Sequence, residues 1–446
     1  MSSTSKSAFY TFLVQIPTQI FGIIAGIFIT RMIGAEGRGL YAIFHADLSL
    51  FTTLLGFSIS TTITYYIANK KLTEEKVLGI TFLFSLITII GSILILLFWI
   101  NLPFADLLFP EENLTLPFIL LFVLYILMNQ INTVYSAYFQ GAKKFKVINR
   151  VMLVNSILNV LIYGIAFTLH YTEFYLIGLY DVLFIGLVII LINVMQWHYH
   201  YIKEHSYNYS FKLSWAQDVK PFFTFMGLGH LSGIINFFNY RLVLWILVYY
   251  LDNEQVGYFS LAFGLTQMLT FVSNPLAQVL FPVLCSEEQD KRHSTFVSFS
   301  RAHFSVLMLM SFVGLIIAPF LIPLLYGSEF YHSTIPFQII LIPTLFSCQT
   351  KIFTTYLFAE GRINTILWAT VTGFLCTLAF NFILIKNFGI EGAAVSTSIT
   401  FLGIFFFIYI ALLIVGALPS KNLFILTPEN INDAKKQFKA RRKGID

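Results

Sequence analysis

Residues 77–100 read VLGITFLFSLITIIGSILILLFWI, an apolar stretch without a single charged side chain. As a helix, this stretch is long enough to cross about 30 Å of hydrocarbon. Comparable apolar stretches recur along the chain, at residues 9–32, 43–68, 116–140, 148–169, 174–197, 222–250, 257–284, 302–326, 334–358, 364–385 and 392–416. The sequence therefore predicts an all-α polytopic membrane protein with about twelve transmembrane helices.

The composition excludes a soluble protein. Of the 446 residues, 57% are hydrophobic and 11% are charged, whereas a soluble domain carries about 25% charged residues. The three cysteines form no CxxC pair, and the histidines at 198, 200 and 205 are loosely spaced, so neither a disulfide framework nor a metal site is expected. The apolar run at 9–32 is too long for a signal-peptide core, and we expect it to remain as the first helix.

Positive charge falls almost entirely on one side of the predicted membrane. With the N-terminus in the cytoplasm, 22 Lys and Arg lie on the cytoplasmic side, and three lie outside, namely Arg31, Arg38 and Lys386. Cytoplasmic segments of membrane proteins carry such an excess of Lys and Arg. The pattern predicts twelve spans with both termini in the cytoplasm.

Two short segments match at an offset of 218 residues. Residues 36–41 read EGRGLY and residues 254–259 read EQVGYF, so that Glu, Gly and an aromatic residue coincide. Such matches are expected if the chain contains a parallel repeat of six helices, as many transporters do. The alternative is chance similarity between two short Gly-rich turns. We predict two six-helix lobes related by a pseudo-two-fold axis, with boundaries at 1–200 for the N-terminal lobe, 201–221 for a cytoplasmic linker, 222–418 for the C-terminal lobe and 419–446 for a basic cytoplasmic tail.

Two cations lie inside predicted helices, where a charge usually faces a cavity or a partner. Arg241 shares a helix face with His230, because eleven residues at about 100° each return to nearly the same side. Lys351 lies on a polar stripe with Thr344, Ser347 and Thr355. These side chains favour a hydrated, cationic cavity, and the alternative is that they form polar contacts between helices or snorkel to the interface.

The remaining candidates complete this predicted site. The proposed substrate-binding residues are Arg241, Lys351, Arg31, His230, Asn236, Gln15 and Gln19. Arg31 and Arg38 sit at the outer end of the first helix, where capping of the helix end is an alternative role. Asp47 and Asp181 are candidates for ion coupling, with a hydrogen-bonded structural role as the alternative. A cavity of net positive charge suits an anionic cargo such as a diphosphate, and suits a cationic drug poorly.

No enzymatic motif is present in the sequence. It contains no GxxxxGK[ST] phosphate loop, no HExxH pair and no GxSxG elbow. We therefore expect a protein that is not an enzyme and that needs neither a cofactor nor a metal.

Several segments resemble one family of transporters. They are TRMIGAEGRGLY at 30–41, GYF at 257–259, EGR at 360–362 and GIEGAA at 389–394, together with Pro282. Their order and spacing resemble the Wzx-like polysaccharide flippases of the multidrug/oligosaccharidyl-lipid/polysaccharide transporter superfamily, from about residue 9 to 416. Many members carry an acidic residue two positions after the arginine that matches Arg241. Here that position is Val243, which departs from the pattern.

The resemblance implies a flippase that works by alternating access in the bacterial cytoplasmic (inner) membrane. Its implied cargo is an undecaprenyl-diphosphate-linked oligosaccharide, a repeat unit of O-antigen or capsule. The implied partners are this lipid-linked oligosaccharide, membrane lipid and polysaccharide polymerase machinery, with no nucleic acid. Twelve spans differ from the fourteen of the related lipid II flippases. The alternatives are a drug/cation antiporter of the same superfamily and a membrane glycosyltransferase or polymerase.

Overall fold

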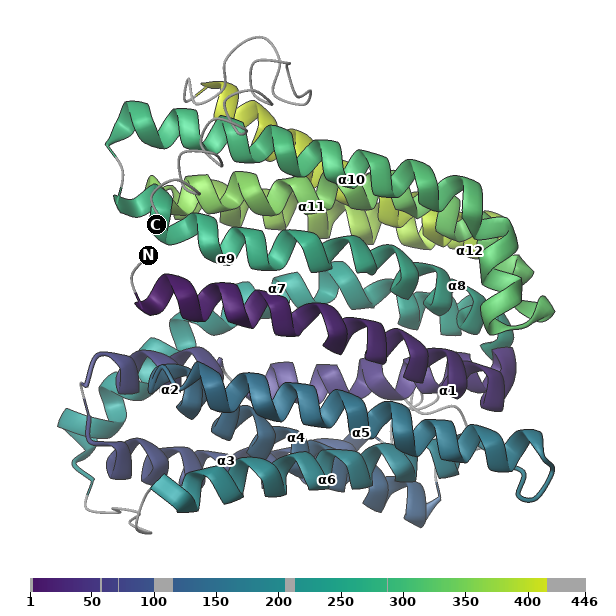
Figure 1. Cartoon of the computed structure of the whole chain (residues 1–446), viewed down its shortest axis with the longest axis horizontal. Coiled ribbons are helices and arrows are strands. Elements are labelled where there is room, and N and C mark those ends of the chain that lie inside the picture. The colour runs from purple at the N-terminus through teal and green to yellow at the C-terminus, as the bar shows by residue number, and fades with distance from the viewer. Residues whose placement is uncertain are drawn as a thin grey trace, which may run out of the picture. The chain divides into compact units, whose positions relative to one another are not determined.

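The computed structural model describes residues 3–56, 58–70, 72–99, 115–204, 213–286 and 288–414, which are helical almost throughout and contain no strand. The predicted basic tail at 419–446 lies outside these ranges. The longer helices are α1 (Ser3–Gly56), α2 (Ile59–Ala68), α3 (Glu74–Trp99), α4 (Leu116–Gly141), α5 (Phe145–Tyr171), α6 (Leu179–Glu204), α7 (Lys220–Tyr250), α8 (Asn253–Thr266), α9 (Thr270–Ser286), α10 (Gln289–Tyr326), α11 (Thr334–Ala359) and α12 (Ile363–Ile414) (Figure 1). Three short helical turns are η3 (Trp215–Val219), η4 (Gln267–Leu269) and η5 (Ser328–Ser333).

Ten helical segments among the described residues are long and apolar enough to cross a membrane. Two of them, Val14–Gly56 and Ile363–Ile414, are each interrupted by a glycine in the left-handed region. Gly34 has φ 66° and Gly389 has φ 58°, a conformation that favours glycine. Counting the two sides of each kink separately gives twelve spans, and the predicted all-α polytopic fold is confirmed.

The second span begins earlier than the sequence predicts. We expected a helix over 43–68, but the chain turns at Gly34 and is helical again from the next residue. The polar residues Glu36 and Arg38 lower the local hydropathy, so the apolar stretch begins later than the helix. Arg38 therefore lies within a membrane helix rather than in a connecting loop.

Backbone packing divides the chain into two compact units. The first is Met1–Ser260 with Leu325–Gly327, and the second is Leu261–Leu324 with Ser328–Asp446. Thus α7 packs with the first unit, whereas the sequence assigns it to the lobe at 222–418. The predicted linker at 201–221 is also partly helical, because α6 continues to Glu204 and η3 begins at Trp215. The lobe boundaries themselves stay a prediction.

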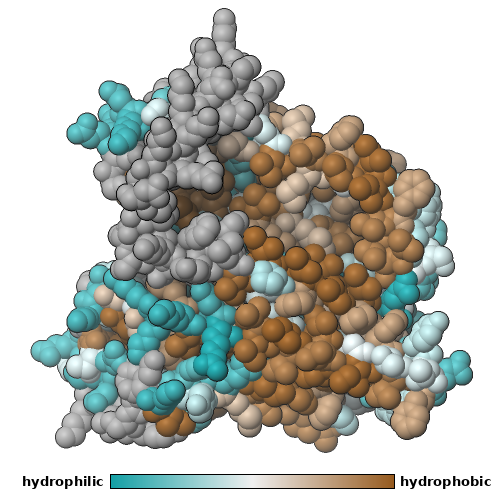
Figure 2. All heavy atoms as spheres, in the orientation of Figure 1, coloured by the Kyte–Doolittle hydropathy of each residue, from teal (hydrophilic) through white to brown (hydrophobic). Residues whose placement is uncertain are grey.

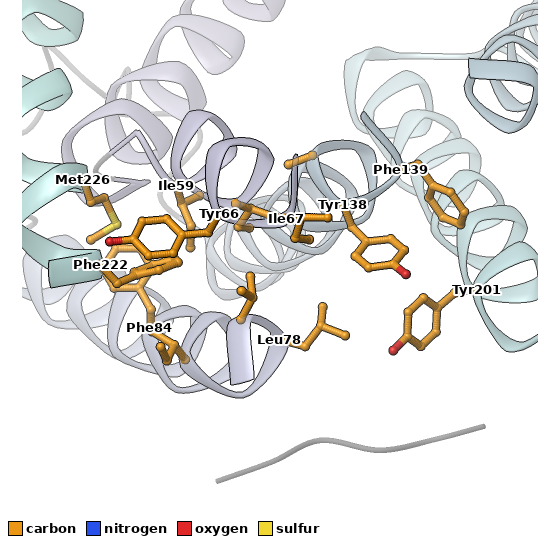
Figure 3. Packing of buried hydrophobic residues seen from close by; sticks show 14 of the residues in the cluster. Ile59, Tyr66, Ile67, Leu78, Phe84, Tyr138, Phe139, Tyr201, Phe222 and Met226 are labelled. Carbon is orange, nitrogen blue, oxygen red and sulfur yellow. The ribbon is translucent and has the colours of Figure 1, made fainter. Parts of the chain in front are cut away.

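An aromatic and aliphatic core holds the start of α7 in the first unit. Phe222 and Met226 of α7 are buried beside Tyr66 and Ile59 of α2 and Phe84 of α3 (Figure 3). The ring centroids of Phe222 and Tyr66 are 5.1 Å apart. Burial of these large side chains favours the packing of α7 against α2 and α3 through the hydrophobic effect.

An ion pair fixes η3 beside the same core. The Nζ atom of Lys76, at the start of α3, donates to Asp218 Oδ2 at 2.8 Å and to Oδ1 at 3.0 Å. The backbone N–H of Ser214 also donates to Asp218. The hydrogen bond from Lys76, followed by that from Ser214, holds the pKa of the Asp218 carboxyl below its usual range.

The second unit has its own core of aromatic side chains. Phe353 of α11 stacks on Phe405 of α12, with centroids 5.7 Å apart, and Phe296 of α10 packs against Tyr356 at 4.5 Å. These side chains are almost completely buried. Ring contacts of this kind add to the stabilisation that burial provides.

The outward faces of the helices are apolar. In the part of Figure 2 occupied by the first unit, hydrophobic residues form a broad band flanked by hydrophilic ones. Large side chains such as Leu94, Ile165 and Phe184 are at least 60% exposed. A soluble protein rarely exposes so large an apolar surface, so the chain is a multi-pass membrane protein whose helices face lipid.

Candidate functional site

Three polar and aromatic residues line one face of α1 after the Gly34 kink. Arg38, Tyr41 and His45 are spaced three and four apart, which places them on the same side of the helix. The Arg38 guanidinium carbon lies 5.6 Å from the Tyr41 ring centroid, and the Tyr41 and His45 ring centroids are 4.3 Å apart. Arg38 Nε and His45 Nε2 are buried without a hydrogen-bond partner in the described part of the chain. Such groups are costly unless water or a ligand satisfies them.

Arg241 of α7 lies near this face. Both Arg241 and Arg38 are close enough to His45 to interact electrostatically with its ring. Arg241 is half-buried, and no carboxylate within the described ranges pairs with it. We call Arg38, His45 and Arg241 the cationic cluster. Its positive charge inside membrane helices lacks a protein counter-ion among the described residues, which suits an anionic ligand.

Asp47 lies on the same stretch of α1 and contacts α7. It is completely buried, and its Oδ1 accepts a hydrogen bond of 2.8 Å from Trp245 Nε1. Its Oδ2 has no partner in the described part of the chain. Trp245 is one helical turn beyond Arg241, on the same side of α7. Val243, at the position of α7 where the resemblance expects a carboxyl, is buried.

Two of the predicted site residues hold helix ends. Arg31 is exposed, and its Nε donates to the carbonyl oxygen of Leu325 at 2.7 Å, in the last turn of α10. A cation there complements the carbonyl end of a helix. Asp181 accepts a hydrogen bond from the backbone N–H of Gly178, at 2.9 Å, at the start of α6. This is the N-terminal capping interaction of an acidic residue in the first turn, and it gives Asp181 a structural contact at the outset of its helix.

The other predicted residues of the first unit lie along α1 and α7. His230 is half-buried and close to the backbone of Leu54 in α1. Gln15 and Gln19 are half-buried in the first span of α1. Asn236 belongs to α7, and its side chain lies outside the described part. Their participation in one cavity with Arg241 stays a prediction.

Lys351 belongs to the second unit, where it has a neutral partner. Its Nζ donates to Asn274 Oδ1 at 2.7 Å, which joins α11 to α9. Its backbone carbonyl accepts from the hydroxyls of Thr354 and Thr355. Among the described residues no carboxylate forms an ion pair with Lys351, so its charge is available for an anion. The predicted common cavity with Arg241 stays a prediction.

A buried hydrogen-bond network lies next to this pair. The His303 ring contacts Gln349 Oε1 at 2.8 Å and Ser273 Oγ at 2.9 Å. Gln349 Nε2 in turn donates to Ser300 Oγ at 2.6 Å. All four residues are buried, so the network fixes α9, α10 and α11 against one another near Lys351.

Sequence analysis considers Arg38 as a substrate contact at the outer end of the first helix, but it identifies neither the grouping of Arg38 with His45 nor the His303 network. The spacing of Arg38, Tyr41 and His45 is a local signal that points to the first group. The His303 network carries no local signal, because its members come from three helices and only tertiary packing brings them together.

Comparisons with known proteins agree with this architecture. The chain is 24% identical over 189 residues to a probable low-salt glycan biosynthesis flippase of Haloferax volcanii, a match that covers 42% of this chain and 40% of that protein. It thus spans less than half the length of that relative. The fold is similar to that of the lipid II flippase MurJ in an inward closed conformation, with a TM-score of 0.68, 14% identity and coverage of 93% of this chain and 89% of that one.

It is also similar to an inward-facing multidrug resistance MATE family transporter of the MOP superfamily, with a TM-score of 0.65 and 14% identity over 91% of this chain and 98% of that one. At 14% sequence identity, the two solved structures show only that this chain shares their fold. The family model described as polysaccharide biosynthesis protein matches residues 4–288, well over half of the chain. The chain belongs to the polysaccharide biosynthesis protein family.

Proposed function

We propose that this protein is a flippase that translocates an undecaprenyl-diphosphate-linked oligosaccharide across the bacterial cytoplasmic membrane. The cargo would be a repeat unit of O-antigen or capsule, delivered to polysaccharide polymerase machinery on the outer side. The similarity to a probable glycan biosynthesis flippase and to a lipid II flippase supports this class of cargo.

The observation that carries the proposal is the cationic cluster. Arg38 and Arg241 lie in membrane-spanning helices near the same histidine, and no carboxylate among the described residues neutralises Arg241. A diphosphate carries negative charge on oxygens that accept hydrogen bonds from guanidinium groups. The buried Arg38 Nε and His45 Nε2, which have no described partner, are donors of the kind that such a headgroup would use.

The proposed cycle uses two six-helix lobes, 1–200 and 222–418, with both termini in the cytoplasm. The diphosphate and sugars enter the cavity while the lipid tail stays in the bilayer, and the lobes then rock to open outward. The charge distribution of the sequence supports the orientation, and the match between 36–41 and 254–259 supports the repeat.

Arg241→Ala tests the proposal in cells. We expect it to abolish the surface glycan at normal membrane protein levels, with Arg241→Lys partly active because a lysine keeps the charge but not the forked geometry. Arg150→Ala is the matched control, since Arg150 is exposed at the start of α5. Loss of the protein from the membrane in Arg241→Ala would make the arginine structural and contradict the proposal.

A drug/cation antiporter is the second candidate, because the completely buried Asp47 is a carboxyl that a cation would favour. Substitution of Lys351 separates the two functions. For an anionic cargo, Lys351→Glu should reduce glycan export more than Lys351→Gln, since like charges repel strongly where the dielectric constant is low. For an antiporter, the glutamate variant should instead raise resistance to cationic dyes. Equal glycan export by both variants would show that Lys351 is not part of the cargo-binding site.

A further inference from the structure

Two glycines allow α1 and α8 to cross with their backbones in direct contact. A Cβ atom added at Gly39 would lie 1.8 Å from the carbonyl oxygen of Asn253, and one added at Gly257 would lie 2.0 Å from the carbonyl oxygen of Ala35. Each would also come within about 3 Å of the backbone nitrogen of the other glycine, at 3.0 and 3.1 Å. No side chain larger than hydrogen fits at either position while the helices stay in this arrangement.

The contact is reciprocal in the way that a two-fold axis requires. Gly39 meets Asn253, and Gly257 meets Ala35. Both Gly39–Gly257 and Ala35–Asn253 are separated by 218 residues, the offset at which EGRGLY matches EQVGYF. When a two-fold axis relates two segments, every contact between them occurs twice with the roles of the segments exchanged. Here Gly39 contacts the equivalent of Ala35, and Gly257 contacts Ala35 itself. This geometry is independent of the sequence match, and it argues against chance similarity between the two turns.

The crossing lies at the ends of membrane spans. Ala35 directly follows the Gly34 kink, and Asn253 is the first residue of α8. Both junctions face the outside in the proposed orientation. We infer that the Gly39–Gly257 crossing is the outer gate of the transport cycle, closed by backbone contact between equivalent helices of the two repeats. This inference rests on the proposed alternating-access function.

Glycine suits such a gate for two reasons. Small residues let membrane helices approach until their backbones touch, which excludes a path for cargo or water along the crossing. Backbones this close can make van der Waals contacts and weak C–H···O interactions, and among the described residues no ion pair joins α1 to α8. The gate therefore closes through packing alone and can open without leaving an unpaired charge at the crossing.

A distance measurement tests the inference without any cargo. Glu36 and Glu254 are exposed, are equivalent at the same offset and flank the crossing. Spin labels at Glu36→Cys and Glu254→Cys, in protein whose native cysteines have been replaced, should show a short distance in nanodiscs. Gly39→Ala and Gly257→Ala should each raise the ratio of long to short distances by at least about tenfold, because the added methyl disfavours only the closed state.

Gly227→Ala is the matched control, since a Cβ at Gly227 meets nothing within 4 Å. Distances in Gly39→Ala and Gly257→Ala that equal those of the control would overturn the inference. If the alanine variants do not fold, the cysteine pair is cross-linked by a bis-maleimide in the protein that keeps both glycines. Export that stops on cross-linking supports the gate, and export that continues at full rate overturns it. Absence of glycan export before cross-linking would instead refute the proposed function, while leaving the distance result intact.

Discussion

Trp245→Phe should destabilise the protein by leaving a buried carboxyl without a donor. Asp47 is completely buried, its Oδ1 accepts from Trp245 Nε1 at 2.8 Å, and its Oδ2 has no described partner. Phenylalanine fills most of the same space but has no N–H. A buried polar group that loses its partner costs about 1–3 kcal/mol, and we expect a decrease of this size in the free energy of unfolding.

The loss of stability caused by Trp245→Phe should depend on the presence of the Asp47 carboxyl. In Asp47→Leu the carboxyl is absent, so the further change Trp245→Phe should cost less than about 0.5 kcal/mol, since replacing both partners by apolar groups is close to neutral. The two differences form a double-mutant cycle. The assay is equilibrium unfolding of purified protein in mixed micelles with rising SDS, with Trp215→Phe as the control because Trp215 is 70% exposed. An equal cost of Trp245→Phe in both backgrounds would refute the reasoning.

Three further predictions test an ion pair, the packing of the core and the orientation in the membrane. Because the pKa of Asp218 is lowered in the folded protein, its ionised form stabilises the fold at pH values above about 4, the ordinary pKa of the carboxyl. Above that pH, Asp218→Asn should therefore have a lower free energy of unfolding than the wild type. The difference between the two proteins should become smaller as the pH falls through the lowered pKa of Asp218, and a difference that does not change with pH would contradict this. Phe222→Ala should cost about 3–5 kcal/mol of stability, whereas Phe184→Ala, at a lipid-facing position, should cost less than about 1 kcal/mol; equal costs would refute the packing argument. A reporter fused near Glu329 should report the outside, and a cytoplasmic signal there would overturn the proposed orientation.

The sequence predicts the fold well because lipid imposes a simple rule on it. Every span must satisfy its own backbone hydrogen bonds, so long apolar stretches become helices. The error at the second span has the same origin. Residues 35–42 are helical but include the charged Glu36 and Arg38, so hydropathy alone begins that helix too late.

The candidate site is predicted less completely than the fold. Arg241 is a charge in an apolar stretch, a signal visible in one segment of sequence. The pairing of Asp47 with Trp245 and the proximity of Arg241 to His45 depend on how α1 packs against α7. Periodicity gives the face of each helix but not its neighbour. The same limit applies to the compact units, because only tertiary packing brings Phe222 of α7 together with α2 and α3.

Transport of a lipid-linked oligosaccharide by the purified protein tests the central claim most directly. The protein is reconstituted into vesicles with undecaprenyl-diphosphate-linked oligosaccharide, and the fraction of cargo that crosses between leaflets is measured with a sugar-modifying enzyme outside. We predict translocation by the wild type and by Arg150→Ala. Translocation by Arg241→Ala should fall at least about tenfold, because loss of a buried charged contact costs about 2–5 kcal/mol. Wild-type vesicles that accumulate cationic dyes but leave the oligosaccharide in its original leaflet would contradict the account.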